Sequence, residues 1–423
     1  MINRFEHGSS LPRVGAVSRV VIALLTIIVV VSGGPVSTAS ADTRAMKHIL
    51  TGARVNGYEG TTLPPSVVAP FVSWAANPAP KAARAVQAAG MKVYAYINPN
   101  RVYSCPGCSS MYGDVSSSSD MTAKDCSGNP ITVAKGKGYL TDVHSPSLIS
   151  TFKRAVLKIQ QSAGITYDAL FVDDFDDVLY TDNGKPCGFD KDDWAKASQV
   201  LLDSAGIPVI FNGLVQGPSE LALVDNPHVL GAMHEGCYGF KNQFGIKGDG
   251  LTTGSEWSKI ENLEIAVAQK HKLFWCDGLN ADPTMQSRLY QLGSFLLTFS
   301  TQYTLLQENY KTSSNLPVMP ESQLVPMDPI QTVGSDVASL RINGALYGRE
   351  YKSCYYAGNL VGPCAVVVNS DAISDFAYPY GGKYAHSLTF QNVGGIVDGG
   401  VATVNGPAPP ARIAAKSAII VFK

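Results

Sequence analysis

The sequence predicts an α/β protein whose main domain is a (β/α)8 TIM barrel, followed by a small antiparallel β-domain at the C-terminal end. Three observations predict this architecture. Short apolar runs alternate with helix-compatible stretches through most of the chain. The connections between the runs are long enough for a helix, which favours parallel pairing. After residue 309 the helix signals stop, and short apolar runs separated by Gly and Pro follow.

Eight apolar runs are predicted to be the barrel strands. They lie at residues 48–50, 67–74, 92–98, 169–173, 209–212, 229–235, 272–277 and 303–308. The predicted helices lie at residues 81–89, 147–163, 192–205, 256–270 and 283–297. An open, doubly wound sheet is the competing architecture. It is disfavoured because the segment after the first strand (TGARVNG) lacks the glycine-rich phosphate turn of that fold.

The composition is that of a globular protein with one large domain and one smaller domain. The chain has 423 residues, of which 45% are hydrophobic and 16% charged, and its formal net charge is -1. These values exclude a coiled coil, a disordered chain and a basic protein that binds nucleic acid. We expect a monomer with a signal peptide at 1–41, the barrel at 42–310, a linker at 311–334 and a β-sandwich-like domain at 335–423.

The N-terminal segment has the pattern of a signal peptide. Arg4, Arg13 and Arg19 precede an apolar run at 20–31 that is too short for a comfortable membrane span of about 20 residues. Small residues at 39–41 suit signal peptidase, so we expect cleavage after Ala41. An uncleaved N-terminal anchor is the alternative. The pattern predicts a secreted or periplasmic protein that has no membrane association after cleavage.

The cysteines predict disulfide bonds, because exported proteins oxidise their thiols. The chain has eight cysteines. We expect a bond between Cys354 and Cys364, which flank a turn-like segment. We also expect loop disulfides among Cys105, Cys108, Cys126 and Cys187. The pair Cys105 and Cys108 could be half of a zinc or redox motif, but a second CxxC and a nearby His pair are missing. We therefore predict neither a metal nor a cofactor.

Acidic side chains follow several of the predicted strands. Barrels of this type build their sites at the carboxyl ends of the strands, where Asp173, Glu235, Asp277 and Glu308 lie in this sequence. An apolar strand that runs into a carboxylate is costly unless the carboxylate faces a solvated cleft. The other polar or aromatic candidates at these ends are Trp74, Tyr96, Asn98, Asp174, Asp176, Asn212 and Trp275.

This set of side chains suits the hydrolysis of glycosides. Breaking a glycosidic bond takes two carboxyl groups, one to protonate the leaving oxygen and one to attack or to activate water. Aromatic faces stack on sugar rings, and amides bind hydroxyl groups. The near-neutral charge suits a neutral or weakly cationic polysaccharide. Strands four and six of a barrel can bring their carboxylates to about 5–6 Å, the separation of retaining enzymes.

The segment from Asp168 to Asp176 (DALFVDDFD) resembles the strand-four signature of barrel glycoside hydrolases related to endo-α-1,4-polygalactosaminidase, glycoside hydrolase family 114. Ala169 stands where that signature has Gly. The resemblance covers residues 45–310. It implies that Asp173 is the nucleophile and that Glu235, at the end of strand six, is the general acid and base. It also implies a polysaccharide substrate, which could be rich in amino sugars.

Several candidates have a second interpretation. Alternation puts Asp173 and Asp174 on opposite faces of the strand without saying which face points inward, so Asp174 is the alternative nucleophile. Asp176 and Asp177 could cap a helix or hold Ca²⁺, and Asp277 could also cap a helix. Glu308 could pair with Arg101, Asn98 could only shape the turn before Pro99, and the two tryptophans could be core residues.

Three other functions compete with glycoside hydrolysis. The first is a non-catalytic carbohydrate-binding barrel, which would bind sugar without turnover. The second is a metal-dependent deacetylase, which needs His ligands, whereas none of the seven histidines forms an HxH or HxxxH motif. The third is a serine hydrolase, which is disfavoured because the sequence has no GxSxG motif.

Overall fold

The computed structural model describes residues 64–76, 80–103, 111, 114–115, 120–175, 179, 181–214, 218–240, 250–279, 284–308, 318–390, 394–396 and 399–423. Several predictions lie outside these residues: the signal peptide, the first predicted strand at 48–50, Cys105 and Cys108, and Asp176.

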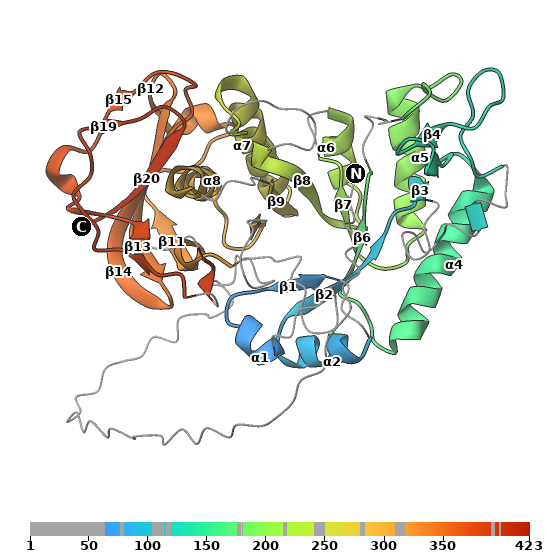
Figure 1. Cartoon of the computed structure of the whole chain (residues 1–423), viewed down its shortest axis with the longest axis horizontal. Helices are drawn as coiled ribbons and strands as arrows, with labels where there is room; N and C mark the ends of the chain where they lie inside the picture. Colours follow the sequence, from blue (N-terminus) through green and yellow to red (C-terminus); the bar gives the residue numbers. More distant parts are fainter. Residues whose placement is uncertain are drawn as a thin grey trace, which may run out of the picture. The chain divides into compact units, whose positions relative to one another are not determined.

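A parallel sheet of seven strands carries the site. The strands are β1 (Trp74–Ala76), β2 (Lys92–Ile97), β6 (Ala169–Val172), β7 (Val209–Asn212), β8 (Val229–Phe240), β9 (Leu273–Leu279) and β10 (Thr304–Glu308). They pair in this order, each parallel to the next. Figure 1 shows β6, β7, β8 and β9 following one another across the sheet. Chain order and sheet order agree, as the predicted barrel requires.

Ring contacts show that the sheet is curled. Tyr94 on β2 and Trp275 on β9 are separated by three strands in the sheet, yet their ring centroids are 5.5 Å apart. Phe171 on β6 lies 5.0 Å from the same Trp275 ring. Such contacts need a concave face, and these residues form one buried cluster together with Trp74, Ala169, Ile210, Met233 and Leu305. The predicted barrel class is therefore confirmed.

Helices connect the strands. They are α1 (Pro65–Val68), α2 (Pro80–Ala88), α4 (Pro146–Ala163), α5 (Lys191–Asp203), α6 (Pro218–Val224), α7 (Gly254–Gln269) and α8 (Met285–Thr298). Local signals set their ends. Ser145 accepts a hydrogen bond from the Leu148 amide at the start of α4, and Gly164 ends that helix in the left-handed conformation. Asp190 caps α5 in the same way as Ser145.

One predicted strand is wrong. Residues 67–74 were expected to be extended, but the segment begins with the short helix α1 and only Trp74 belongs to β1. Pro65 lies in the first turn of that helix, where the fixed φ of proline favours helix initiation. The other strands begin and end close to their predicted positions, except β8, which continues five residues past its predicted end at 235.

A small antiparallel sheet follows β2. It consists of β3 (Arg101–Tyr103), β4 (Thr132–Val133) and β5 (Gly138–Leu140), in the order β3-β5-β4. The disulfide between Cys126 and Cys187 joins this connection to the one that follows β6. Both connections leave the carboxyl ends of their strands, so they lie at the end of the sheet where the candidate residues were expected.

The C-terminal part forms an antiparallel sheet in the order β11-β13-β14-β20-β16, with β12 beside β13. Its strands are β11 (Leu324–Pro329), β12 (Arg341–Asn343), β13 (Leu346–Tyr356), β14 (Asn359–Asn369), β16 (His386–Ser387) and β20 (Ser417–Phe422). Two smaller pairs join β15 (Phe376–Ala377) to β19 (Arg412–Ile413), and β17 (Thr389–Phe390) to β18 (Ala402–Thr403). The short 3-10 helices are η1 (Pro320–Gln323), η2 (Val337–Leu340) and η3 (Gly381–Lys383). Residues 318–334, expected as linker, contain η1 and β11, while the domain boundaries themselves stay predictions.

Helix α8 lies between the barrel and the antiparallel sheet, and its residues from Ser287 to Thr298 are buried. The phenol of Tyr351 on β13 donates a hydrogen bond to the Leu296 carbonyl of this helix at 2.6 Å. A β-carbon at Gly293 would lie 2.5 Å from the β-carbon of Ala418 on β20, so the close packing requires glycine there. The two sheets therefore share one buried helix.

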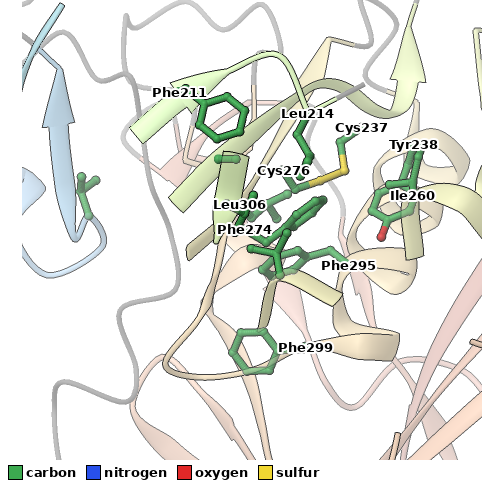
Figure 2. Packing of buried hydrophobic residues seen from close by; sticks show 14 of the residues in the cluster. Phe211, Leu214, Cys237, Tyr238, Ile260, Phe274, Cys276, Phe295, Phe299 and Leu306 are labelled. Atoms are coloured by element: carbon green, nitrogen blue, oxygen red, sulfur yellow. A yellow bond between two sulfur atoms is a disulfide. The ribbon is translucent and has the colours of Figure 1, made fainter. Parts of the chain in front are cut away.

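The disulfide predictions are confirmed where the structure describes the cysteines. Cys354 bonds to Cys364 between β13 and β14, and Cys126 bonds to Cys187. A further bond joins Cys237 on β8 to Cys276 on β9 (Figure 2).

Candidate active site

The concave face of the sheet determines which strand-end residues meet. Phe171, Met233 and Trp275 belong to the buried cluster on that face. Because side chains alternate along a strand, the residues two positions further on continue the same face. Those residues are Asp173 after β6, Glu235 on β8 and Asp277 on β9, with Asn212 two positions after Ile210 on β7. Asp173, and not Asp174, therefore continues the concave face of predicted strand four.

Three donors hold the carboxylate of Asp173. The Tyr96 hydroxyl donates to Oδ2 at 2.6 Å. The side-chain amide of Asn212 donates to Oδ1 at 2.8 Å, and the backbone amide of Asp174 donates to the same oxygen at 2.9 Å. The carboxylate is therefore fixed at the mouth of the barrel, because both of its oxygens are hydrogen-bonded.

Asn212 also joins Asp173 to Glu235. Its Nδ2 atom donates to Glu235 Oε2 at 2.9 Å as well as to Asp173 Oδ1 at 2.8 Å. The two carboxylate oxygens can therefore be no further apart than the sum of these distances, about 5.7 Å. Asp173 is half-buried and Glu235 is exposed. The two carboxylates are separated by the width of the buried Asn212 amide group.

Burial and negative neighbours change the ionisation of two of these carboxyls. Burial raises the pKa of Asp173 to about 7, and the negative charge of Asp174 raises it further. The hydrogen bonds from Tyr96 and Asn212 act in the opposite direction and lower it. Burial also raises the pKa of Asp277 well above its usual range, with further contributions from Glu235 and Asp173. Asp277 pairs with Glu235 in the register of β8 and β9, so the two strand ends carry their carboxyls side by side.

Asp174 has a different environment from Asp173. Its φ of 54° is left-handed, a conformation that Asp tolerates better than most residues. Its carboxylate accepts hydrogen bonds from Arg101 Nη1 at 2.5 Å and from the Asn98 side-chain amide at 2.6 Å. The Tyr103 hydroxyl donates to it at 3.2 Å. Asp174 therefore forms an ion pair with the segment that follows β2.

Sequence reasoning missed three members of this network. Asn100, Arg101 and Tyr103 were not among the site candidates, and Arg101 was considered only as a partner of Glu308. Asn100 donates to the backbone carbonyl of Asp174 at 3.1 Å. Asn98 shapes the turn, since its Oδ1 accepts the Arg101 amide at 2.9 Å, and its side-chain amide also donates to Asp174. Its contact with a sugar stays a prediction. The signal that could have found Asn100 and Arg101 is the polar segment 98–101 (NPNR) directly after an apolar strand.

The remaining candidates lie in other environments. Trp74 and Trp275 are only 3% and 2% exposed. Both belong to the aromatic cluster inside the barrel, so they are core residues in this structure. The side chain of Glu308 lies outside the described residues, as does the whole of Asp176.

The described residues contain no group of three or more His, Cys, Asp or Glu side chains arranged to hold a metal ion. Among the same residues, no helix is both long and apolar enough to span a bilayer.

Several solved structures with similar folds are glycoside hydrolases. The glycoside hydrolase domain of PelA from Pseudomonas aeruginosa is 11% identical, with a TM-score of 0.43 over 59% of this chain and 92% of that domain. Ega3 from Aspergillus fumigatus, solved with galactosamine, is 11% identical, with a TM-score of 0.38 over 56% and 84%. An α-amylase from Malbranchea cinnamomea is 11% identical, with a TM-score of 0.41 over 90% and 86%.

No protein-family model matches the sequence, and no curated protein matches it. At these identities and TM-scores the three neighbours do not assign an activity to this chain.

Proposed function

We propose that the protein is a secreted glycoside hydrolase that cleaves a polysaccharide by a retaining mechanism with two carboxylates. The observation that carries the proposal is the hydrogen bonding of Asn212 to both Asp173 and Glu235, which keeps their oxygens within about 5.7 Å. Retaining enzymes separate their carboxyl groups by about 5–5.5 Å, whereas inverting enzymes need about 6.5–9.5 Å to admit a water molecule. The separation therefore favours direct attack by one carboxylate.

Asp173 is the nucleophile in this proposal and Glu235 is the general acid and base. Asp173 attacks the anomeric carbon while Glu235 protonates the leaving oxygen, and a glycosyl-enzyme ester forms. Glu235 then takes a proton from water, which attacks the anomeric carbon and releases Asp173. The donors on Asp173 support the nucleophilic role because they fix its orientation. The exposure of Glu235 suits a group that must reach both the leaving group and water.

The charge of the mouth supports a substrate that carries positive charge. Asp173, Glu235 and Asp277 lie together there, and Arg101 is paired with Asp174. Burial raises the pKa of Asp173 and Asp277, but a cationic ligand would lower these pKa values again and pair with the ionised carboxylates, whereas an anionic ligand would raise them further. A polymer that contains unacetylated amino sugars meets this requirement. The disulfides of the described chain support export to an oxidising compartment.

The test begins with a panel of bacterial and fungal polysaccharides and a mass-spectrometric readout of the products. Asp173→Asn and Glu235→Gln should each lower turnover by several orders of magnitude, because each change keeps the volume and removes the reacting group. Asp168→Asn is the matched control. Asp168 precedes β6 at its other end, where its carboxylate accepts the Val93 amide at 2.8 Å. This control should keep its turnover.

A substrate with an activated leaving group separates the two roles. A nitrophenyl glycoside should partly restore the first step in Glu235→Gln but not in Asp173→Asn. Added azide should give a glycosyl azide of retained configuration in the Glu235 variant. Rescue at Asp173 alone would exchange the roles. Sugar binding without turnover by the unmodified protein would instead identify a non-catalytic carbohydrate-binding barrel.

A further inference from the structure

Strand β8 leaves the regular ladder directly after Glu235. Glu235 is paired with Asp277 on β9, and the next paired residues are Phe240 and Leu279. Between these positions β8 has the four residues 236–239, whereas β9 has only Gly278. This is a special bulge, with four residues opposite one, and bulges beside functional sites change the direction of a neighbouring side chain. We call residues 236–239 the β8 bulge.

The backbone of the β8 bulge is strained. Gly236 has a φ of 83° and Tyr238 a φ of 56°, both left-handed. Glycine adopts this region freely, but a bulky residue such as tyrosine is an outlier there. A conformation of this kind costs about 1–3 kcal/mol and persists only where the surroundings hold it. The bulge therefore needs contacts that fix it.

Two buried side-chain contacts hold the bulge, in addition to the backbone amide of Thr252, which donates to the Tyr238 carbonyl at 3.1 Å. The first is the disulfide from Cys237 to Cys276, the residue before Asp277 on β9 (Figure 2). The second is the hydrogen bond from the Tyr238 hydroxyl to Glu264 Oε2 on α7, at 3.1 Å. Cys237, Tyr238 and Glu264 are each 0% exposed, so neither contact competes with water. Tyr238 also appears beside the disulfide in Figure 2.

We propose that these two contacts, which we call the bulge clamp, position Glu235 for proton transfer. The inference rests on the proposed function, in which Glu235 is the acid and base. Glu235 is itself exposed, and the next residue, Gly236, does not restrict its backbone. The first fixed points after Glu235 are therefore Cys237 and Tyr238. Both are positioning residues, because they act through Glu235 and not on the substrate.

The disulfide between Cys354 and Cys364 provides a matched control. All four cysteines of the two bonds are at most 1% exposed, and each bond joins neighbouring strands. The control bond lies between β13 and β14 of the antiparallel sheet. Cys237→Ala with Cys276→Ala removes the clamp disulfide, and Cys354→Ala with Cys364→Ala removes the control disulfide.

The clamp variant should lower kcat on the polysaccharide by about 10- to 100-fold with little change in KM, since a misplacement of about 1 Å costs up to about 100-fold. The control variant should keep kcat within about twofold. Both are compared below their unfolding temperatures, with the fold checked by circular dichroism. The loss should be smaller on a nitrophenyl glycoside, because that leaving group needs less help from an acid.

A double-mutant cycle with Glu235→Gln decides whether the clamp acts through Glu235. Removing the disulfide in the Glu235→Gln background should cause almost no further loss. Equal losses in the two backgrounds, or equal losses for the clamp and control variants, would overturn the inference while leaving the proposed function intact. Full activity of Glu235→Gln alone would instead overturn the proposed role of Glu235.

A second variant tests the same clamp if the disulfide variant does not fold. Tyr238→Phe keeps the ring and the disulfide and removes only the hydroxyl that bonds to Glu264. It should lower kcat by a smaller factor and show the same lack of additivity with Glu235→Gln. Unchanged kcat in Tyr238→Phe would contradict a positioning role for that hydrogen bond.

Discussion

Burial raises the pKa of carboxyls in two regions of the described chain, and the surroundings of these carboxyls differ. One region is the mouth of the barrel, where Asp173 and Asp277 lie beside the exposed Glu235. The other is the layer around α7 and α8, with Glu261, Glu264 and Glu321, all 0% exposed. Burial raises the pKa of Asp173 and Asp277 in the first region and of Glu261, Glu264 and Glu321 in the second. A raised pKa therefore does not by itself distinguish a catalytic carboxyl from a structural one.

The partners of the carboxyls distinguish the two regions. In the layer, the Glu321 carboxylate accepts two hydrogen bonds from Arg288, one from Nε and one from Nη2, at 2.5 Å each. Glu261 accepts the Thr298 hydroxyl at 2.9 Å. These groups are enclosed, and Glu264 is linked to the mouth only indirectly, through its hydrogen bond from Tyr238. In the mouth, Asp173 is half-buried, Glu235 is exposed, and neither has an ion pair among the described residues. Neutral donors therefore hold the pair at the mouth, whereas a cation holds Glu321 in the layer.

The largest expected effect on stability is in the layer. Arg288→Met leaves the Glu321 carboxylate buried without its cation, and breaking a buried pair in this way costs about 3–5 kcal/mol. The free energy of unfolding, measured by chemical denaturation, should fall by that amount. Lys259→Met is the control, because Lys259 pairs with Glu256 at 2.7 Å on the exposed side of α7. Its loss should stay below about 1 kcal/mol. Similar losses in both variants would contradict the distinction between the regions.

The next effect concerns the pH dependence of catalysis. A carboxyl with a pKa of about 7 is protonated below that pH and cannot act as a nucleophile. We expect kcat/KM to fall by about tenfold for each pH unit below about 7. Asp174→Asn removes the neighbouring charge that helps to raise the pKa of Asp173, so the acidic limb should move to lower pH. Activity that falls above pH 7 and persists below it would make Asp173 the acid.

The smallest expected effect is the change of folding stability with pH that Glu264 in the layer causes. Burial raises the pKa of Glu264 to about 8, above its usual value of 4.5. A carboxyl whose pKa is higher in the folded state stabilises the fold when protonated. This contribution is complete below about pH 4.5 and is lost as the pH rises towards 8. The melting temperature should decline over this range, and Glu264→Gln should reduce the decline. Glu256→Gln, a substitution at an exposed residue of the same helix, should leave the decline of the melting temperature unchanged.

Much of the barrel could be predicted from local sequence. Strands β2, β6, β7, β9 and β10 coincide with continuous apolar runs, because strands covered on both faces need no polar positions. The same property hides the direction of the side chains. All four residues of β6 are buried, so alternation could not show whether Asp173 or Asp174 points inward. The segment 67–74 failed as a strand because its apolar residues follow a proline pair that starts a helix.

The sequence by itself determined the class of the fold, the strand ends that carry carboxylates and the disulfide from Cys354 to Cys364. These depend on the order of apolar and polar residues over short distances. Only the tertiary structure decided that Asn212 joins Asp173 to Glu235, that Arg101 pairs with Asp174 and that both tryptophans are core residues. Each of these contacts joins residues from different strands or from the segments that follow them. Their geometry depends on how the sheet curls, and no local pattern of residues records that curvature.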